Sequence, residues 1–399
     1  MSYQTYRPRN AKPRYGTSRS SRPTGNRRST KQYIHPSKFV KPAQLKADIE
    51  VYTPINVFAD FSMHPILHGN LVQKGFVSPT PIQDQAIPHG LEGRDVVGIA
   101  NTGTGKTIAF AIPVLHQLMN NRSSNALIMA PTRELAQQIE AECRMIAKGS
   151  GLSGTLLIGG TSMGPQLNGL RNKPRIVIGT PGRIKDHITR GTLEISKFDI
   201  VVLDEVDRML DMGFVTDITF ILNAAAPKRQ SFFFSATMDP KVNVIMRNFT
   251  SDPITISVKT GDTSDAVEQD IVAYNTSSDK IEQLHELLNK AEVAKVLVFD
   301  ETQRSVERLS RELQARGFKA DDIHGGKSQG QRQRALRSFR DNNIRILVAT
   351  DVAARGIDII DITHVINYSQ PQTYDDYIHR IGRAGRAGRT GFAYTFVQS

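Results

Sequence analysis

The sequence contains 399 residues, with 51 Lys and Arg against 39 Asp and Glu, which gives a formal net charge of +12. Residues 1–46 hold 12 of the basic residues and no acidic residue, so residues 47–399 are formally neutral. At 39% apolar residues the chain can bury a core, and at roughly 150 residues per domain it predicts two or three domains. The single cysteine, Cys143, excludes an intrachain disulfide framework and a cysteine-cluster zinc site.

The N-terminal 46 residues are rich in Arg, Ser, Gly and Pro. Because such a composition has too few apolar side chains to offset the entropy of ordering, it predicts a disordered basic tail over residues 1–46. The tail lacks the apolar segment of a secretory signal, and no apolar run approaches the roughly 18 residues needed to cross a bilayer. We expect a cytoplasmic protein, with an organelle transit peptide as the alternative.

Beyond the tail, short apolar runs alternate with helical segments, a pattern typical of parallel βαβ units. The first series of predicted strands comprises Val96–Ala100, Ala126–Ala130, Thr155–Ile158, Arg175–Ile178, Ile200–Leu203 and Ser231–Ser235. The second series comprises Asp270–Tyr274, Lys295–Phe299, Ile344–Ala349, His364–Asn367 and Phe392–Phe396. A polar stretch of small residues separates the two series. The sequence therefore predicts two α/β domains with parallel sheets, at residues 47–258 and 269–399, joined by a linker at 259–268.

The sequence Ala-Asn-Thr-Gly-Thr-Gly-Lys-Thr follows the first predicted strand and precedes a helical run. It matches the Gly-x-x-x-x-Gly-Lys-Thr phosphate-binding pattern except for Ala100 at the first position. Glycines let backbone N–H groups surround phosphate oxygens, and the helix N-terminus adds partial positive charge. Lys106 is expected to reach the β- and γ-phosphates, and the Thr107 hydroxyl to bind Mg²⁺. The predicted nucleotide contacts are Ala100, Asn101, Thr102, Gly103, Thr104, Gly105, Lys106 and Thr107.

Two acidic residues, Asp204 and Glu205, follow the predicted strand Ile200–Leu203. A carboxylate at the end of a buried strand can hold Mg²⁺ through water, which is the role expected of Asp204. Its neighbour Glu205 is expected to polarise the attacking water as a general base. Together with the phosphate-binding loop, this pair predicts a nucleoside triphosphatase.

The run Asp204-Glu205-Val206-Asp207, followed by Ser235-Ala236-Thr237, resembles the signature of DEAD-box ATP-dependent RNA helicases of superfamily 2, in a DEVD variant. The resemblance covers essentially residues 58–399 and implies two RecA-like domains in tandem, with ATP and Mg²⁺ as cofactors and RNA as partner. It implies that Phe58 and Phe76 contact the nucleotide, with Phe76 stacked on adenine, and that Gln83 binds the adenine edge. A side-chain amide offers both a donor and an acceptor, which would favour ATP over GTP. Coupling roles are implied for Ser235, Thr237, Asp207 and His379.

Other stretches resemble the RNA-contacting motifs of the family. Hydroxyls, backbone amides and helix N-termini suit a sugar–phosphate backbone and carry little base information. The residues that the resemblance assigns to RNA are Pro131, Thr132, Arg133, Gly159, Gly160, Thr180, Pro181, Gly182, Arg183, Gln329, Arg332, Thr350 and Asp351.

The run from His379 to Arg386 resembles the sixth motif of the family. It implies that Arg383 and Arg386 stabilise charge on the γ-phosphate after the domains close, and Asp358 is implied as a nucleotide contact. With Glu205 and Lys106, the two arginines complete the predicted catalytic set. Val206 stands where the family usually has Ala, and because it contributes no catalytic group, activity is expected to survive. Asn101, a shorter amide, stands where the family usually has Gln.

The sequence thus predicts a monomeric ATP-dependent RNA helicase that binds RNA backbone between two domains. ATP hydrolysis would be coupled to local duplex unwinding or RNA–protein remodelling. An alternative is a nucleotide-gated RNA-binding clamp with little hydrolysis, and a third possibility is a DNA helicase. A stimulating protein partner is left open. The basic tail is expected to act as an electrostatic tether for RNA with little sequence preference.

Overall fold

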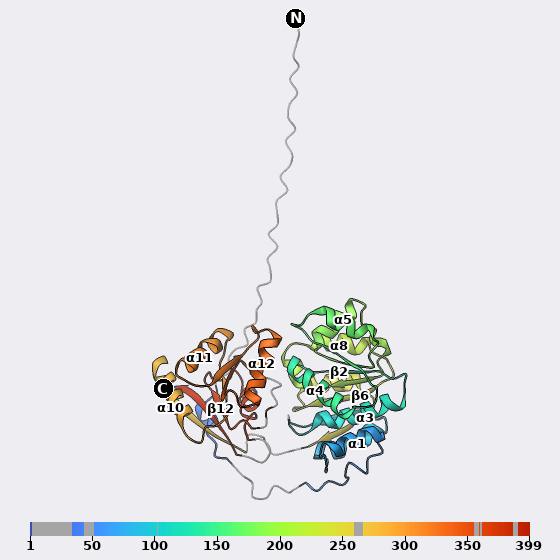
Figure 1. Cartoon of the computed structure of the whole chain (residues 1–399), viewed down its shortest axis with the longest axis horizontal. Coiled ribbons are helices and arrows are strands. Elements are labelled where there is room, and N and C mark those ends of the chain that lie inside the picture. Colours follow the sequence, from blue (N-terminus) through green and yellow to red (C-terminus); the bar gives the residue numbers. More distant parts are fainter. Residues whose placement is uncertain are drawn as a thin grey trace.

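The computed structural model describes residue 1 and residues 34–43, 52–101, 103–258, 266–354, 359, 361–385 and 390–399. In these ranges the chain forms two α/β domains in tandem, each built on a sheet whose paired strands are all parallel (Figure 1). The predicted fold class is confirmed. The predicted site residues Thr102, Asp358 and Arg386 lie outside the described residues, as do 2–33 and 44–46 of the predicted tail. No helix in the described ranges has the length and apolar composition needed to cross a bilayer.

The sheet of the first domain has the strand order β3-β4-β2-β5-β6-β1-β7. Its strands are β1 (Val96–Ile99), β2 (Ala126–Met129), β3 (Gly154–Leu157), β4 (Ile176–Gly179), β5 (Ile200–Leu203), β6 (Gln230–Ser235) and β7 (Ile254–Ser257). The first six match the predicted strands to within one residue at either end. The prediction missed β7, which pairs with β1 at the edge of the sheet. Its sequence Ile-Thr-Ile-Ser alternates apolar and polar residues, whereas the predicted strands were identified as continuous apolar runs.

Helices cover both faces of this sheet, because both faces are apolar. Neighbouring strand residues point to opposite faces, so Val96 and Val97 belong to different core clusters. The helices are α1 (Pro65–Gln73), α2 (Pro81–Leu91), α3 (Lys106–Asn120), α4 (Arg133–Ile146), α5 (Met163–Arg171), α6 (Pro181–Thr189), α7 (Val206–Asp211), α8 (Val215–Ala224) and α9 (Pro240–Phe249), with a 3-10 turn η2 (Ile195–Lys197). Helices α1 to α4 contribute to the cluster of Val96, and α6 to α9 to that of Val97.

The sheet of the second domain has the order β10-β11-β9-β12-β13-β8. Its strands are β8 (Val267–Tyr274), β9 (Val296–Phe299), β10 (Ala320–Ile323), β11 (Ile346–Ala349), β12 (His364–Asn367) and β13 (Gly391–Gln398). Its helices are α10 (Ser277–Asn289), α11 (Gln303–Ala315), α12 (Gln329–Arg340), α13 (Asp351–Ala354) and α14 (Tyr374–Ile381). The prediction missed β10, because Asp321 and Asp322 interrupt its apolar pattern. Strand β8 begins at Val267, inside the predicted linker of residues 259–268.

Residues 34–43 differ from the prediction of a tail that is disordered through residue 46. They contain the 3-10 helix η1 (Pro36–Phe39), and Phe39 is fully buried in the apolar core of the second domain. Lys41 forms an antiparallel bridge with Gln269 of β8. The prediction weighed the composition of all 46 residues together. It therefore overlooked that a few apolar residues can pack on a surface formed by distant parts of the chain.

Candidate functional site

The predicted phosphate-binding loop connects β1 to α3, as the sequence pattern requires. Ala100 N donates to Ser235 O of β6 at 2.9 Å, which fixes the start of the loop beside the neighbouring strand. Gly105 has a φ of 93°, a left-handed conformation that suits glycine, and a Cβ there would overlap the amide of Gln83. Helix α3 begins at Lys106, so its first N–H groups face the loop and can bind phosphate oxygens.

Buried polar atoms without hydrogen-bond partners gather where β5 and β6 meet this loop. Lys106 Nζ lies 3.8 Å from Asp204 Oδ1, and both side chains are buried. Among the described residues, these two atoms, Glu205 Oε2 and Ser235 Oγ have no hydrogen-bond partner. Buried groups of this kind are costly unless a ligand completes their bonds. The ammonium of Lys106 suits a phosphate, and the oxygens of Asp204 and of Thr107, which follows Lys106 in sequence, suit Mg²⁺. The residues therefore fit a nucleoside triphosphate with Mg²⁺.

Glu205 has a left-handed backbone, with φ 56° and ψ 55°. For a residue other than glycine this conformation is strained, and such strain clusters at functional sites. Burial alone would raise the pKa of Glu205, but the positive charges of Arg208 and Lys106 outweigh it and lower that pKa. Burial raises the pKa of the adjacent Asp204. Arg208 also belongs to the site, although no sequence motif had indicated it. Its Nε lies 3.5 Å from Glu205 Oε2.

Asp207 connects the β5 motif to the segment after β6. Its Oδ2 accepts hydrogen bonds from Ala236 N and Thr237 N, each at 3.1 Å, and from Thr237 Oγ1 at 3.3 Å. These bonds join two of the residues for which the family resemblance implies a coupling role. The neighbouring Val206 is fully buried in an apolar cluster, so its extra methyl groups add to the core.

The predicted adenine-binding residues lie at the start of α2. Gln83 Nε2 donates to Gly105 O at 3.0 Å, and Gln83 Oε1 accepts from Thr80 N at 2.9 Å. The same amide therefore also supports the phosphate-binding loop. Phe76 is half-buried, and Phe58 packs edge-on against it with 5.9 Å between ring centroids. Phe58 is only 2% exposed, so it supports Phe76 from behind and has little surface for the nucleotide contact that was predicted.

Asp84, next to Gln83, holds the chain that precedes the first domain. Its carboxylate accepts bonds from Tyr52 OH at 2.6 Å, Ile55 N at 2.7 Å, and Asn56 N and Nδ2 at 3.1 and 2.7 Å. Burial alone would raise the pKa of Asp84, but these bonds, led by that from Tyr52, lower it. No motif indicated this residue, because its donors come from a segment about thirty residues away.

Helix α14 brings the sixth motif of the second domain to the same site. Arg380 donates two bonds to Asp351, at 2.6 and 2.7 Å. Asp351 was predicted to bind RNA, but its carboxylate is paired with this guanidinium, and phosphates would repel it. Arg383 is buried, and its charge and that of His379 help to lower the pKa of Glu205. The predicted arginine finger therefore lies near the predicted general base of the other domain.

Gln329 and Arg332, predicted to bind RNA, contact the first domain. They lie on α12, which faces α4 across the interface between the domains (Figure 1). Arg332 Nε and Nη2 each lie 2.8 Å from Glu134 Oε1, and Gln329 Nε2 donates to Gln137 Oε1 at 3.2 Å. Because Arg332 is only 6% exposed and Glu134 neutralises its charge, it acts as an interdomain contact in this structure. The sequence motif identified Arg332 as a donor but did not identify Glu134 as its partner.

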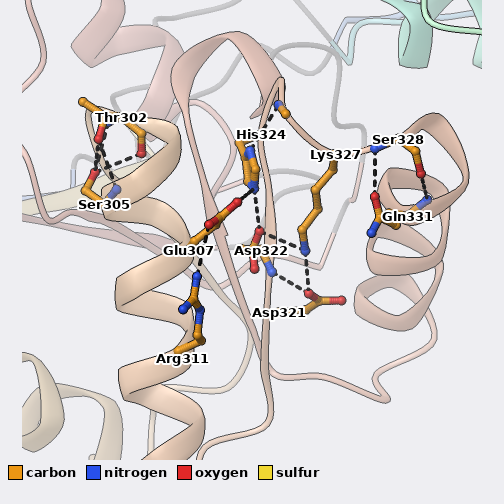
Figure 2. A network of polar contacts seen from close by, with 11 residues as sticks. Thr302, Ser305, Glu307, Arg311, Asp321, Asp322, His324, Lys327, Ser328 and Gln331 are labelled. Carbon is orange, nitrogen blue, oxygen red and sulfur yellow. Dashed lines mark hydrogen bonds and ion pairs between the residues drawn. The ribbon is translucent and has the colours of Figure 1, made fainter.

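A polar network in the second domain lies directly before α12 (Figure 2). His324 Nε2 lies 3.1 Å from both Glu307 Oε1 of α11 and Asp322 Oδ1 of β10. His324 Nδ1 accepts from Gly326 N at 3.2 Å, and its Nε2 faces the two carboxylates. Lys327 Nζ adds an ion pair with Asp322 at 2.9 Å. The network fixes the entry into α12 and hence the position of its interdomain contacts.

The other residues predicted to bind RNA lie mainly at the carboxyl ends of β2, β3 and β4. Thr132 and Thr180 are the N-caps of α4 and α6. Gly160 has a φ of 69° and lies against the guanidinium of Arg133. Burial and the positive charge of Arg332 lower the pKa of Arg133. The full set is Pro131, Thr132, Arg133, Gly159, Gly160, Thr180, Pro181, Gly182 and Arg183, with Thr350 after β11 in the second domain. Hydroxyls, cations and helix N-termini suit a sugar–phosphate backbone.

Family models match both domains of the chain. The model of the DEAD/DEAH box helicase matches residues 80–245, and that of the helicase conserved C-terminal domain matches residues 279–388. The ATP-dependent RNA helicase CshA of Listeria monocytogenes is 44% identical over 344 residues, which are 86% of this chain and 66% of that protein. The DEAD-box ATP-dependent RNA helicase CshA of Bacillus subtilis is 42% identical over 342 residues, or 85% of this chain and 69% of that protein. The chain thus spans about two thirds of the length of these curated relatives.

A solved structure of S. cerevisiae Dbp5 bound to RNA and ADP BeF3 is similar to both domains. It has a TM-score of 0.76 at 29% identity, and the match covers 86% of this chain and 89% of that chain. The resemblance drawn from the motifs is confirmed by the family models and by these relatives. The chain belongs to the family of DEAD-box ATP-dependent RNA helicases.

Proposed function

We propose that this chain closes its two domains around ATP and RNA backbone and couples ATP hydrolysis to local strand separation or RNA–protein remodelling. The observation that carries the proposal is the buried contact between the two domains, in which Arg332 of the second lies 2.8 Å from Glu134 of the first. The charge of Arg383 of the second domain also helps to lower the pKa of Glu205 of the first. Likeness to Dbp5 bound to RNA and ADP BeF3, where beryllium fluoride stands in for the γ-phosphate, supports a closed arrangement. The proposal includes a monomeric, cytoplasmic enzyme.

The first domain would bind the nucleotide. Phe76 would stack on adenine, Gln83 would bind its edge, and Lys106 would reach the β- and γ-phosphates. Thr107 and, through water, Asp204 would hold Mg²⁺, which neutralises charge on the phosphates when it is bound. The unpartnered buried atoms of Lys106 and Asp204 support this placement.

Hydrolysis would need groups from both domains. Glu205, kept ionised by the cations around it, would accept a proton from the attacking water. Arg383 would stabilise the charge that develops on the γ-phosphate, and Arg386 and Asp358 are proposed to contact the nucleotide there as well. Because ATP and RNA would both favour the closed state, each should strengthen the binding of the other.

Single-stranded RNA is expected to stimulate steady-state ATP turnover of the full chain, because it favours the closed state in which Arg383 reaches the nucleotide. The measurement is phosphate release with and without RNA, with DNA of the same sequence as competitor. Lys106→Ala should abolish turnover in both conditions. RNA binding without stimulated turnover would instead support the nucleotide-gated clamp, and equal stimulation by DNA would support a DNA helicase.

Deleting residues 1–33 is expected to flatten the salt dependence of RNA binding and to spare ATP turnover in the absence of RNA. The deletion removes nine of the twelve Lys and Arg in residues 1–46 and keeps residues 34–43, which pack on the second domain. Each lost phosphate contact lowers the slope of log K against log salt by roughly 0.7 for a single strand. A full-length variant with the same nine residues changed to Gln is the matched control. An unchanged slope would contradict the tether.

A further inference from the structure

The N-terminal strap, defined here as residues 34–43, packs on the second domain although it precedes the first domain in sequence. Phe39 is fully buried, and its ring lies against Tyr377 of α14 with 4.8 Å between ring centroids. Lys38 Nζ lies 5.3 Å from the centroid of the Tyr374 ring, one turn earlier on the same helix. The strap therefore covers the stripe of α14 that carries its two tyrosines.

Gln269 connects the strap to α14 a second time. Gln269 N donates to Lys41 O at 2.8 Å, and Lys41 N donates to Gln269 O at 2.9 Å. Gln269 Oε1 accepts a bond from Tyr377 OH at 3.0 Å. Strand β8 is the edge of the sheet, so Lys41 satisfies backbone groups that no other strand pairs with. One buried residue thus contacts the strap through its backbone and the helix through its side chain.

The turn of α14 after Tyr377 leads to the two arginines of the sixth motif, Arg380 and Arg383. Arg380 is held by its two bonds to Asp351, and Arg383 follows the end of the helix at Ile381. The helix has only 8 residues, so a shift at Tyr377 is passed directly to the arginines. Side chains that act on a transferring phosphoryl group lose effect when displaced by about 1 Å.

We infer that the strap is part of the hydrolysis site, with Phe39 as a positioning residue that holds α14 so that Arg383 reaches the γ-phosphate. This inference rests on the proposed function of Arg383. Beyond residues 44–51, which lie outside the described residues, Tyr52 donates to Asp84 beside Gln83, the proposed adenine contact. The strap thus contacts α14, and Tyr52 contacts α2.

Phe39→Ala in the full chain is expected to lower kcat for RNA-stimulated ATP hydrolysis about tenfold or more, with little change in KM for ATP. The nucleotide is held by the first domain, which explains the expected split between kcat and KM. In an Arg383→Ala background, Phe39→Ala should cause no further loss, because its effect passes through that arginine. Amide hydrogen exchange in residues 374–383 should become faster in Phe39→Ala.

Phe396→Ala is the matched control. Phe396 is a buried ring of the same domain, in a cluster that contains no described residue of α14. It should lower the melting temperature without the non-additive kcat effect. Phe39→Leu, which keeps an apolar contact, should give a smaller loss if Phe39→Ala folds poorly. Unchanged kcat in both Phe39 variants, or additivity with Arg383→Ala, would overturn the inference. Unchanged turnover in Arg383→Ala alone would instead overturn the proposed role of Arg383.

Discussion

Replacing Glu205 by Gln is expected to lower ATP turnover by about 10²–10⁴-fold while the protein still binds ATP and RNA, since this is the usual contribution of a general base. The amide keeps the shape of the side chain but cannot accept a proton from water. Glu205 occupies a strained left-handed position and is buried beside Lys106 and Arg208. These cations favour its ionised form, which is the form that can accept a proton. Single-turnover hydrolysis with bound RNA measures the chemical step directly.

Glu194→Gln provides the control for this result. Glu194 is an exposed acid of the same domain, on the segment before β5, where it forms an ion pair with the exposed Lys197. The same chemical change there should leave turnover within about twofold of wild type, as expected for a surface substitution. If Glu205→Gln hydrolysed ATP at the wild-type rate, the base would have to be another group.

Replacing Arg332 by Ala is expected to weaken RNA binding in the presence of a non-hydrolysable ATP analogue and to leave nucleotide-free RNA binding nearly unchanged. In the closed state Arg332 and Glu134 form a buried pair with 2.8 Å contacts, and removing one partner leaves the other charge buried. Truncations of this kind cost about 2–5 kcal/mol, and only the closed state carries that cost. RNA titrations with and without the analogue measure the difference.

Arg334→Ala is the matched control, because Arg334 is exposed on the same helix α12 and carries the same charge. The double variant Glu134→Ala/Arg332→Ala should recover part of the lost affinity, since neither charge is then left alone. If Arg332→Ala weakened RNA binding equally without nucleotide, the arginine would contact RNA directly, as its sequence motif had indicated. The two roles are therefore distinguished by whether the loss of RNA affinity depends on nucleotide.

Secondary structure followed from the sequence wherever local pattern and burial agreed. The six predicted strands of the first domain lie in a sheet buried on both faces, so each is a short apolar run. Each of the two missed strands, β7 and β10, lies at one edge of its sheet. Their polar residues, such as Asp321 and Asp322, are tolerated where one side of the strand has no neighbour. Strand identity there depends on position in the sheet, which the sequence does not show.

Site residues could be found from motifs, but their partners could not. Arg332 and Asp351 were both assigned to RNA, yet one is paired with Glu134 of the other domain and the other with Arg380. Each partner lies far away in sequence, and a charged side chain binds whichever opposite charge the fold brings near. Arg208 and Asp84 were not indicated by a motif for the same reason, since the fold brings their partners to them.

The charge of +12 alone suggested one basic protein, and the sequence by itself already separated a basic N-terminal segment from two neutral domains with the residues of a nucleotide site. The residues of the nucleotide site could be identified from their spacing in sequence, because the phosphate-binding loop and the strand-end carboxylates depend on local backbone geometry. Only the tertiary structure decided where Phe39 and its neighbours belong. Burial of a ring in the core of the second domain requires a surface built from β8, β13 and α14, and no local pattern in residues 34–43 encodes that surface.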